Sequence, residues 1–499
     1  MGYLGNAPYQ GSQIGSGSIQ DGGVQTVDIA DGAVTLAKLA ATGTKSGTTF
    51  LAGDNTFKTV SVTPTAVSDQ DNTSTGAFDL PSGTTAQRPA SPNIGYLRYN
   101  TESLATEIYT SAGWTKVANT PPLITSITGV IYSGATSSIT LNGTNFGFLV
   151  GVVTFISGAT TKTVSATPTS QTAVSVSVPS EIYSLGSGSS VTVSFANSDG
   201  LASNQYASTL QGIPSGGTIT TTGSYRVHTF TSSGSLTVPS GFSKSAEYMV
   251  IAGGGGGGPL GGGGGAGGYL AGTTTISAGT YSFAIGAGAN GGNGGGSSGG
   301  TGSNTTAFGL TALGGGGGGS HNNGATSAPG TNGGSGGGGS DNSGSYGPGS
   351  GTAGQGYGGG VGSTVYSNNP RGGGGGGGAG GVGLSRDNGG HGGPGVLNAI
   401  NGTALYWAGG GGCSGYSGSS AGNGGIGGGG GGSTPSPGTA GTGGGSALNS
   451  GGNGQSADNV MGGQGGQNTG GGGGALSWQF DGTGTRSGGS GIVIVRYTL

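Results

Sequence analysis

The chain has 499 residues, only 6% of them charged, and its formal net charge of −3 arises from 13 basic and 16 acidic residues. Because no block of either sign occurs, the chain cannot neutralise many phosphates, which argues against nucleic acid as a ligand. The single cysteine, Cys413, excludes an intrachain disulfide and a thiolate zinc cage.

Glycine is unevenly distributed: 30 of the 133 glycines lie in residues 1–250 and 103 in residues 251–499. This asymmetry marks a compositional boundary near Ile251. The start of the chain lacks a signal-peptide pattern, and no apolar run reaches the ~18 residues that span a bilayer. We therefore expect the chain to be made in a cytoplasm and not to cross a membrane by these routes.

The first predicted segment, residues 1–60, carries a short repeat. "IQDGGVQTVD" begins at Ile19 and "IADGAVTLAK" at Ile29, and each has Asp-Gly at its third and fourth positions. So few apolar positions cannot close a core in one chain, and such units bury themselves against symmetry mates. We predict a stalk or docking segment that favours a trimer.

The next stretches predict small β modules. "GTTFLAGDNTFKTV", residues 47–60, places apolar residues around a Gly-Asp-Asn turn and predicts a hairpin. In residues 61–120, aromatic residues alternate with polar ones in a predicted meander with strands at Tyr96–Tyr99 and Glu107–Tyr109, followed by Trp114. The Asp-Gly-Ala-Val repeat, "FLAGDNTF" and this module resemble segments of phage tail-fibre proteins.

Residues 121–211 contain short alternating strands every eight to twelve residues, such as "SSITL", "GVVTF" and "SSVTVSFANSDG". This spacing predicts a β-sandwich. The segment, with its "NGTNF" turn at Asn142–Phe146, is similar to the IPT/TIG immunoglobulin-like family. The resemblance implies a spacer.

After a predicted linker at residues 212–217, residues 218–499 form the glycine-rich domain. Apolar runs lead directly into glycine, as in "EYMVIAGGGGGG" and "TALYWAGGGG", and the sequence closes on the predicted strand "IVIVRYTL". The strands at Met249–Ala252 and Ile492–Val495 are too apolar to be left exposed. They predict a folded body around the glycines.

A flexible linker is the alternative that composition favours. Five glycine runs recur within one region, however, whereas a linker would join two domains. Pinned by a β framework, extended glycine helices with three residues per turn can pack side by side, because no Cβ separates their backbones. We predict an all-β modular fibre that ends in a polyglycine-II sandwich, with Ala266 and Ala379 on its outer faces.

In composition and layout, residues 218–499 resemble the tip adhesins of T-even-like phage long tail fibres, without a matching residue motif. The resemblance implies that variable loops between the glycine helices bind a host surface. Three insertions and "CSGYSGSS" are rich in aromatic and amide side chains, which suit adaptable recognition. The receptor-binding candidates are Tyr346, Tyr357, Tyr366, Asn368, Asn369, Arg371, His321, His391 and Tyr416. Some of them could instead only cap helix ends or fill gaps.

No pattern indicates catalysis or a cofactor. His228, His321 and His391 lack the close spacing of metal motifs, and acids are too few to suggest paired-carboxylate chemistry. Repeated G-x-G-x-x-G matches lack the helix and spaced acid of a dinucleotide site, and no Gly-Lys-Ser/Thr occurs. We predict a protein that is not an enzyme and holds neither metal nor cofactor.

These patterns together predict a phage tail fibre of the virion. Its N-terminus would dock to tail or baseplate proteins as a homotrimer, and its glycine-rich domain would bind a host glycan or outer-membrane protein. A structural head, neck or tail fibre without receptor binding is the main alternative. A glycan-cleaving spike lacks a carboxylate cluster, and ice binding would require flat faces without long irregular loops.

Overall fold

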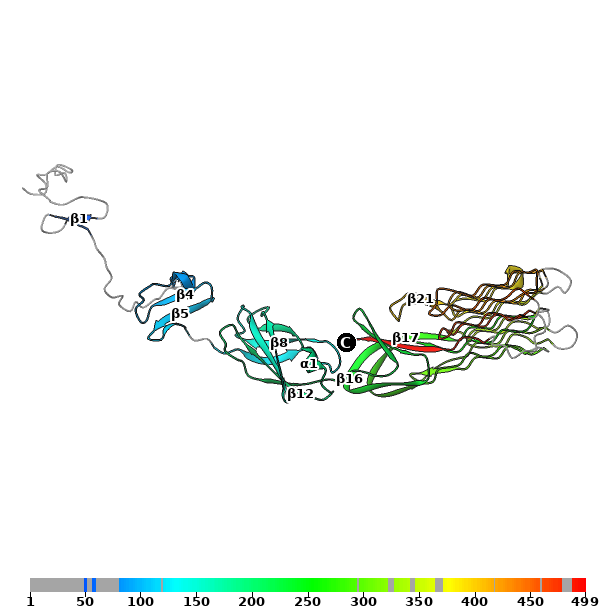
Figure 1. The fold of residues 1–499 in the computed structure, drawn as a ribbon, viewed down its shortest axis with the longest axis horizontal. Helices are drawn as coiled ribbons and strands as arrows, with labels where there is room; N and C mark the ends of the chain where they lie inside the picture. The colour runs from blue at the N-terminus through cyan, green and yellow to red at the C-terminus, as the bar shows by residue number, and fades with distance from the viewer. Residues whose placement is uncertain are drawn as a thin grey trace, which may run out of the picture. The chain divides into compact units, whose positions relative to one another are not determined.

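The computed structural model describes residues 49–51, 56–59, 80–117, 120–293, 296–321, 327–341, 346–363, 371–416, 418–457, 460–477 and 487–499. The chain divides into two compact units, Met1–Val117 and Ala118–Leu499. Almost all of the regular structure is β-strand (Figure 1), which confirms the all-β class. The Asp-Gly repeats lie outside the described residues.

The first unit contains two small sheets. β1 (Thr49–Leu51) pairs with β2 (Phe57–Thr59) in antiparallel register, which confirms the predicted hairpin. The second sheet has the order β3-β4-β5-β6, formed by β3 (Ser82–Gly83), β4 (Leu97–Asn100), β5 (Ala105–Thr110) and β6 (Gly113–Lys116). Its last three strands form the predicted antiparallel meander.

The second unit begins with a two-layered sandwich. One sheet has the order β10-β9-β12-β13 and the other β11-β8-β7. The strands are β7 (Leu123–Thr128), β8 (Ser138–Thr144), β9 (Gly151–Ser157), β10 (Thr160–Ala166), β11 (Ala173–Ser177), β12 (Ser190–Ala196) and β13 (Tyr206–Thr209). Alternate residues such as Leu141, Phe155 and Phe195 point inward and are fully buried. The predicted sandwich is therefore present, with one short helix, α1 (Ser180–Tyr183), between β11 and β12.

A five-stranded sheet, in the order β14-β15-β22-β16-β17, supports the glycine-rich region. Its strands are β14 (Thr218–Thr222), β15 (Tyr225–Phe230), β16 (Gly234–Ile251), β17 (Tyr269–Phe283) and β22 (Ile492–Thr498). β22 lies between β15 and β16, so the final strand pairs with earlier ones as predicted. Two hairpins extend the framework: β18 (Thr305–Ala307) with β19 (Leu310–Ala312), and β20 (Val396–Asn398) with β21 (Leu405–Trp407).

The segment "YRVHTFTSSGSLTVP", which begins at Tyr225, is divided between β15 and β16. A bend at residues 231–233 ends β15, and β16 then continues through a register irregularity after Val238 to Ile251. The segment predicted to be a linker is held against this strand, because Ser215 and Thr237 exchange two backbone hydrogen bonds of 2.9 Å.

Both faces of the sheet are buried where β16 ends, which explains the continuous apolar run at Met249–Ala252. Met249 and Ile251 enter one hydrophobic cluster, with Trp407 and Ile494, whereas Val250 and Ala252 enter the cluster on the opposite face. All four residues of the run are fully buried. The prediction that this strand needs a folded body around it is confirmed.

The glycine runs form helices with a period of three residues. In the run 261–268, the N–H groups of Gly262, Gly265 and Gly268 donate to carbonyls of one neighbouring segment, 313–319. Gly263 and Ala266 donate to a second segment, 374–377, and Gly264 and Gly267 to a third, 470–473. These bonds measure 2.7–3.1 Å. A repeat of three with bonds only between segments is the polyglycine-II arrangement.

Run 261–268 is the centre of this packing. Its carbonyls accept hydrogen bonds from three further segments, represented by Gly255, Gly338 and Gly411. The run is thus surrounded by six neighbours, and every residue in it is buried. The glycines of this run are structured, as predicted, and the N–H groups of residues 262–268 all donate to carbonyls of neighbouring segments.

The two alanines contradict their predicted place on outer faces. Ala266 is fully buried and Ala379 is 8% exposed, and both lie in the hydrophobic cluster that contains Met249 and Trp407. A Cβ is tolerated there because the glycine helices meet apolar side chains of the sheet rather than another backbone.

Replacement of a central glycine should destabilise the domain. A Cβ at Gly263 would lie 2.0 Å from the carbonyl oxygen of Gly411, so the helices would have to separate. We expect Gly263→Ala to lower the free energy of unfolding by at least about 1–3 kcal/mol, the usual cost of overpacking. Thermal unfolding monitored by calorimetry measures the change.

Gly445→Ala is the matched control, because a Cβ at Gly445 would have no heavy atom within 4 Å. It should be neutral or stabilising by up to about 1 kcal/mol through the unfolded state. Equal effects of the two substitutions would contradict the close packing.

His228 links stability to pH. Its ring is buried between the Gly216 carbonyl, 2.8 Å from Nδ1, and the Tyr497 hydroxyl, 2.9 Å from Nε2. A carbonyl can only accept, so Nδ1 carries a proton and Tyr497 donates to Nε2 of the neutral ring. Burial lowers the pKa of His228 from its usual 6.5.

A depressed histidine pKa contributes stability that is complete above pH ~6.5 and is lost as pH falls toward the folded-state pKa. We expect the melting temperature of the wild-type chain to decrease between pH 7 and pH 5. His228→Gln should flatten this decrease. An unchanged slope in the variant would show that His228 is not its source.

Candidate functional site

The turns between the glycine helices gather at one end of the domain, opposite the sheet (Figure 1). We call this the turn end and define it by Pro259–Leu260, Ser320–His321, Asp341, Arg371, Ser414–Tyr416, Ser433–Thr434 and Leu476–Ser477. Backbone hydrogen bonds connect these turns: Leu260 donates to Leu476, His321 to Pro259, and Ser414 to Gly261. Segments far apart in sequence therefore form one end face.

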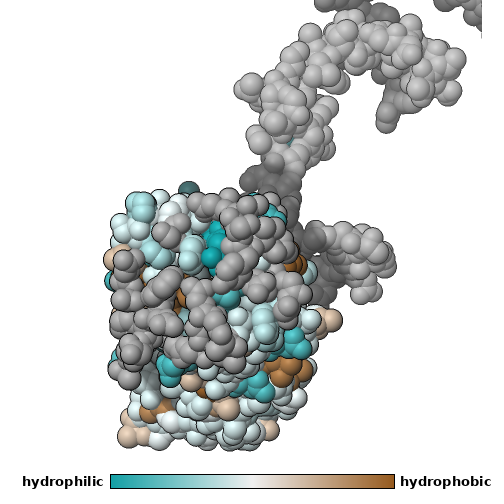
Figure 2. Space-filling view, turned by 90° about the vertical axis from the view of Figure 1, so that its right-hand side faces the viewer, coloured by the Kyte–Doolittle hydropathy of each residue, from teal (hydrophilic) through white to brown (hydrophobic). Residues whose placement is uncertain are grey.

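Figure 2 views this end. The described residues are mostly pale, as expected for glycine, with teal polar residues and separate brown hydrophobic ones among them. The described part of this face is therefore a glycine scaffold that carries a few larger side chains.

Arg371 is the best-fixed candidate at the turn end. Its Nη2 lies 2.8 Å from Oδ2 of Asp341, and both side chains are largely buried. The guanidinium also lies over the ring of Tyr416, 4.1 Å from its centroid, and the Tyr416 N–H donates to the Arg371 carbonyl. Sequence reasoning named Arg371 and Tyr416, but it missed Asp341, because no pattern connects a lone aspartate to an arginine thirty residues away.

The other candidates at this end differ in exposure. His321 is 6% exposed, and its Nδ1 lies 3.1 Å from the Ser327 hydroxyl. Tyr346 is partly buried, and its carbonyl accepts from Ser340. Tyr366, Asn368 and Asn369 lie outside the described residues.

His391 has a structural contact on a flank of the domain. Its Nδ1 accepts a 2.9 Å hydrogen bond from the Asn423 N–H. Amide side chains do the same at other edges, where Asn453 accepts from Gly443 and Asn332 from Ser350. An outer glycine helix lacks a neighbouring helix on one side. The His391, Asn453 and Asn332 side chains therefore accept hydrogen bonds from backbone N–H groups that, in the interior, donate to the carbonyls of a neighbouring helix.

Tyr357 lies at the other end of the domain, near the sheet. It is 50% exposed and lines a pocket of about 500 Å³ with Tyr269, Gln355, Ala379 and Val396. The Tyr269 hydroxyl accepts a 2.7 Å hydrogen bond from Asn398, and burial raises the pKa of Tyr269. The pocket thus contains one hydrogen-bonded tyrosine, Tyr269, and one exposed tyrosine, Tyr357, beside several glycines. None of its described lining residues is charged.

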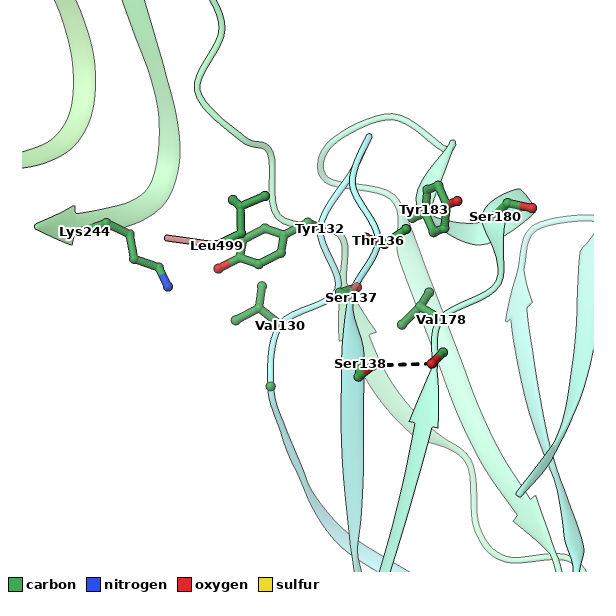
Figure 3. A pocket seen from close by; sticks show the side chains of 12 residues that line it. Val130, Tyr132, Thr136, Ser137, Ser138, Val178, Ser180, Tyr183, Lys244 and Leu499 are labelled. Carbon is green, nitrogen blue, oxygen red and sulfur yellow. Dashed lines mark hydrogen bonds between the residues drawn. The ribbon is translucent and has the colours of Figure 1, made fainter. Parts of the chain in front are cut away.

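A larger hollow of about 800 Å³ lies where the sandwich meets the five-stranded sheet (Figure 3). Val130, Tyr132 and Ser137 line it from the sandwich, and Lys244 reaches it from β16. Tyr132 also packs into the hydrophobic cluster of the sheet. Its described lining residues include no carboxylate side chain and no imidazole. We therefore interpret the hollow as a gap in the packing between the sandwich and the sheet.

Among the described residues, no three His, Cys, Asp or Glu side chains are placed to share a metal ion. In that same part of the chain, no helix is long and apolar enough to cross a membrane.

Comparisons with known proteins identify one region. Residues 228–465 match the family model of a glycine-rich domain. No curated protein matches the chain. Among solved structures, the chain is similar to the crystal structure of chicken CNTN1 FN1-FN3 domains, with 12% identity over 36% of this chain and 69% of that one. The TM-score of 0.15 is too low to support an argument.

The Asp341–Arg371 pair should stabilise the turn end. Asp341→Asn leaves a largely buried guanidinium without its carboxylate, which costs about 3–5 kcal/mol in comparable buried pairs. Glu181→Gln is the control, because the Lys162–Glu181 pair is exposed, at 41% and 49%, and exposed ion pairs contribute little to stability. Calorimetric unfolding of both variants tests this, and equal small effects would show that the buried pair is dispensable.

Proposed function

We propose that the chain is a tail-fibre protein of a bacteriophage virion, whose glycine-rich domain binds the host bacterial surface. The observation that carries the proposal is the construction of the turn end. The turns of six or more described glycine helices lie at one end face. The helices that support these turns are buried and hydrogen-bonded to one another. Recognition residues commonly lie on loops held by such a rigid scaffold.

The binding we propose is non-covalent. Tyr416 at the turn end and Tyr357 in the neutral pocket can each offer an aromatic surface to a sugar ring or an apolar group, at small cost in side-chain entropy. Asp341, the carboxylate among the described residues of the turn end, is paired with Arg371, and we propose adhesion rather than catalysis. The ligand would be a surface glycan or an outer-membrane protein.

The N-terminal segment, residues 1–60, would dock the fibre to tail or baseplate proteins. Its repeats are the reason to propose a homotrimer, because each repeat has too few apolar positions to bury itself alone. The small β modules and the sandwich would then act as spacers.

Binding of the purified full chain to cells of a susceptible strain tests the proposal. We expect the wild-type chain to label the cells and to reduce phage adsorption by competition. Tyr357→Ala combined with Tyr416→Ala should weaken cell binding by about tenfold or more, the effect of losing a hot spot. Tyr96→Ala, which removes a 44% exposed tyrosine from the first unit, is the control and should bind normally.

A structural fibre without receptor binding is the second candidate, and a specific observation favours it. Arg371, His321 and His391, all proposed from sequence as contact residues, have internal partners. Absence of cell binding by the wild-type chain would support this alternative and would contradict the adhesin.

A further inference from the structure

Two outer glycine helices, residues 449–455 and 461–467, enclose a groove of about 490 Å³. Gly452 donates to the Gln464 carbonyl and so connects the two helices, and both are hydrogen-bonded to the buried helix at residues 428–432. A volume of this size is typical of a pocket for a small ligand.

Amide side chains line this groove. We call it the amide groove and define it by Asn449, Asn453, Gln455, Met461, Gln464 and Gln467. The five amide residues are exposed, and none of the described lining residues is charged. In a helix with three residues per turn and a rise of about 3.1 Å per residue, Met461, Gln464 and Gln467 form one row with a spacing of about 9 Å. A ligand that contacts the whole row is therefore elongated.

Three of these amides are each held by one polar atom. Asn453 Oδ1 accepts a 2.8 Å hydrogen bond from the Gly443 N–H, and Asn449 Nδ2 donates over 2.6 Å to the Gln467 carbonyl. Gln467 Oε1 lies 3.3 Å from the Ser490 hydroxyl that donates to it. An amide side chain has both an acceptor oxygen and a donor NH₂ group. Asn453 Nδ2, Gln467 Nε2 and Asn449 Oδ1 therefore have no partner among the described residues and are available to a ligand.

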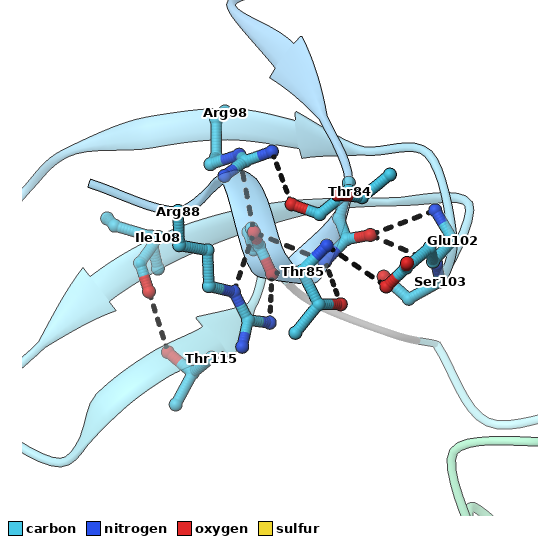
Figure 4. A network of polar contacts seen from close by, with 10 residues as sticks. Thr84, Thr85, Arg88, Arg98, Glu102, Ser103, Ile108 and Thr115 are labelled. Atoms are coloured by element: carbon cyan, nitrogen blue, oxygen red, sulfur yellow. Dashed lines mark hydrogen bonds and ion pairs between the residues drawn. The ribbon is translucent and has the colours of Figure 1, made fainter. Parts of the chain in front are cut away.

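A polar cluster in the first unit provides a contrast. Glu107 is 1% exposed, accepts hydrogen bonds from Arg88 and Asn100, and has Arg98 3.4 Å away (Figure 4). Its carboxylate is enclosed by donors of the protein itself and is not accessible to a ligand. The amide groove instead combines fixed side chains with unused donors and an unused acceptor. Such preorganisation lowers the entropy cost of binding.

We propose that the amide groove binds a neutral oligosaccharide that lies along the glycine helices. Sugar hydroxyls both donate and accept hydrogen bonds, and so match a groove that offers both. Met461 can contact the apolar face of a sugar ring. An acidic ligand would find no cation among the described lining residues, and a protein partner would lack the aromatic and arginine anchors that dominate protein interfaces.

This site is separate from the turn end and from the pocket beside Tyr357, and it goes beyond the adhesion proposed for them. Soluble oligosaccharides test it without host cells. Failure of the groove and failure of the adhesin are therefore recognised by different experiments.

Methyl NMR of the full chain, labelled with carbon-13 at its methionine methyl groups, tests the groove. The chain has three methionines. Met461 lies in the groove, and the fully buried Met249 is the internal reference. Titration with maltotriose, cellotriose and chitotriose should shift the Met461 signal for at least one of them and leave the Met249 signal unchanged. Trigalacturonate, the acidic counterpart, should shift neither signal.

Asn453→Asp combined with Gln467→Glu should weaken binding of the trisaccharide. Each substitution keeps the oxygen that accepts a hydrogen bond from the protein and replaces the NH₂ donor with a second oxygen. We expect the affinity to fall by about tenfold or more, because two hydrogen bonds to the ligand are lost.

Asn304→Asp combined with Asn332→Asp is the matched control. These asparagines also accept hydrogen bonds from backbone N–H groups, and their replacement adds the same charge, but neither lines the groove. The control should bind as the wild type does, and the Met249 signal reports whether each variant is folded. Three results would overturn the proposal: no shift of the Met461 signal with any neutral trisaccharide, a larger shift with trigalacturonate, or equal affinity of the two double variants.

Discussion

The absence of a side chain at glycine is the constraint on which the structure of the larger domain depends. Two backbones without Cβ atoms can approach closely enough to bond in several directions, and the run 261–268 does so with six neighbours. Each ordered glycine costs about 1–2 kcal/mol of backbone entropy, and a hydrogen bond returns only about 0.5–1.5 kcal/mol. The helices therefore need support from elsewhere.

The five-stranded sheet gives that support. β22 and the end of β16 are buried on both faces. The cluster around Met249, Trp407 and Ile494 also receives Ala266 and Ala379 at the ends of glycine runs. Apolar burial at the sheet thus fixes one end of the glycine helices. The hydrogen bonds between the helices keep them ordered from there to the turn end. Residues such as Arg371 and Asp341 then close the far end with polar contacts.

The sequence predicted much of this fold because its signals were local. The run "MVIAGGGGGG" reveals a buried strand that enters a glycine helix, and alternation in residues 121–211 reveals the sandwich. The positions of Ala266 and Ala379 were predicted wrongly, because their surroundings depend on which helix ends meet the sheet. The partners of Arg371 and His391 were likewise out of reach, since Asp341 and Asn423 approach them only through the packing of distant segments.

The central claim is that the glycine runs form an ordered, hydrogen-bonded scaffold. Native-state amide hydrogen exchange of the full chain, resolved for residues 261–268, tests it most directly. We expect strong protection at the amides of residues 262–268, comparable with that of the buried end of β16, because each donates to a carbonyl of a neighbouring segment. Exchange at the rate of an unstructured glycine chain would contradict the scaffold.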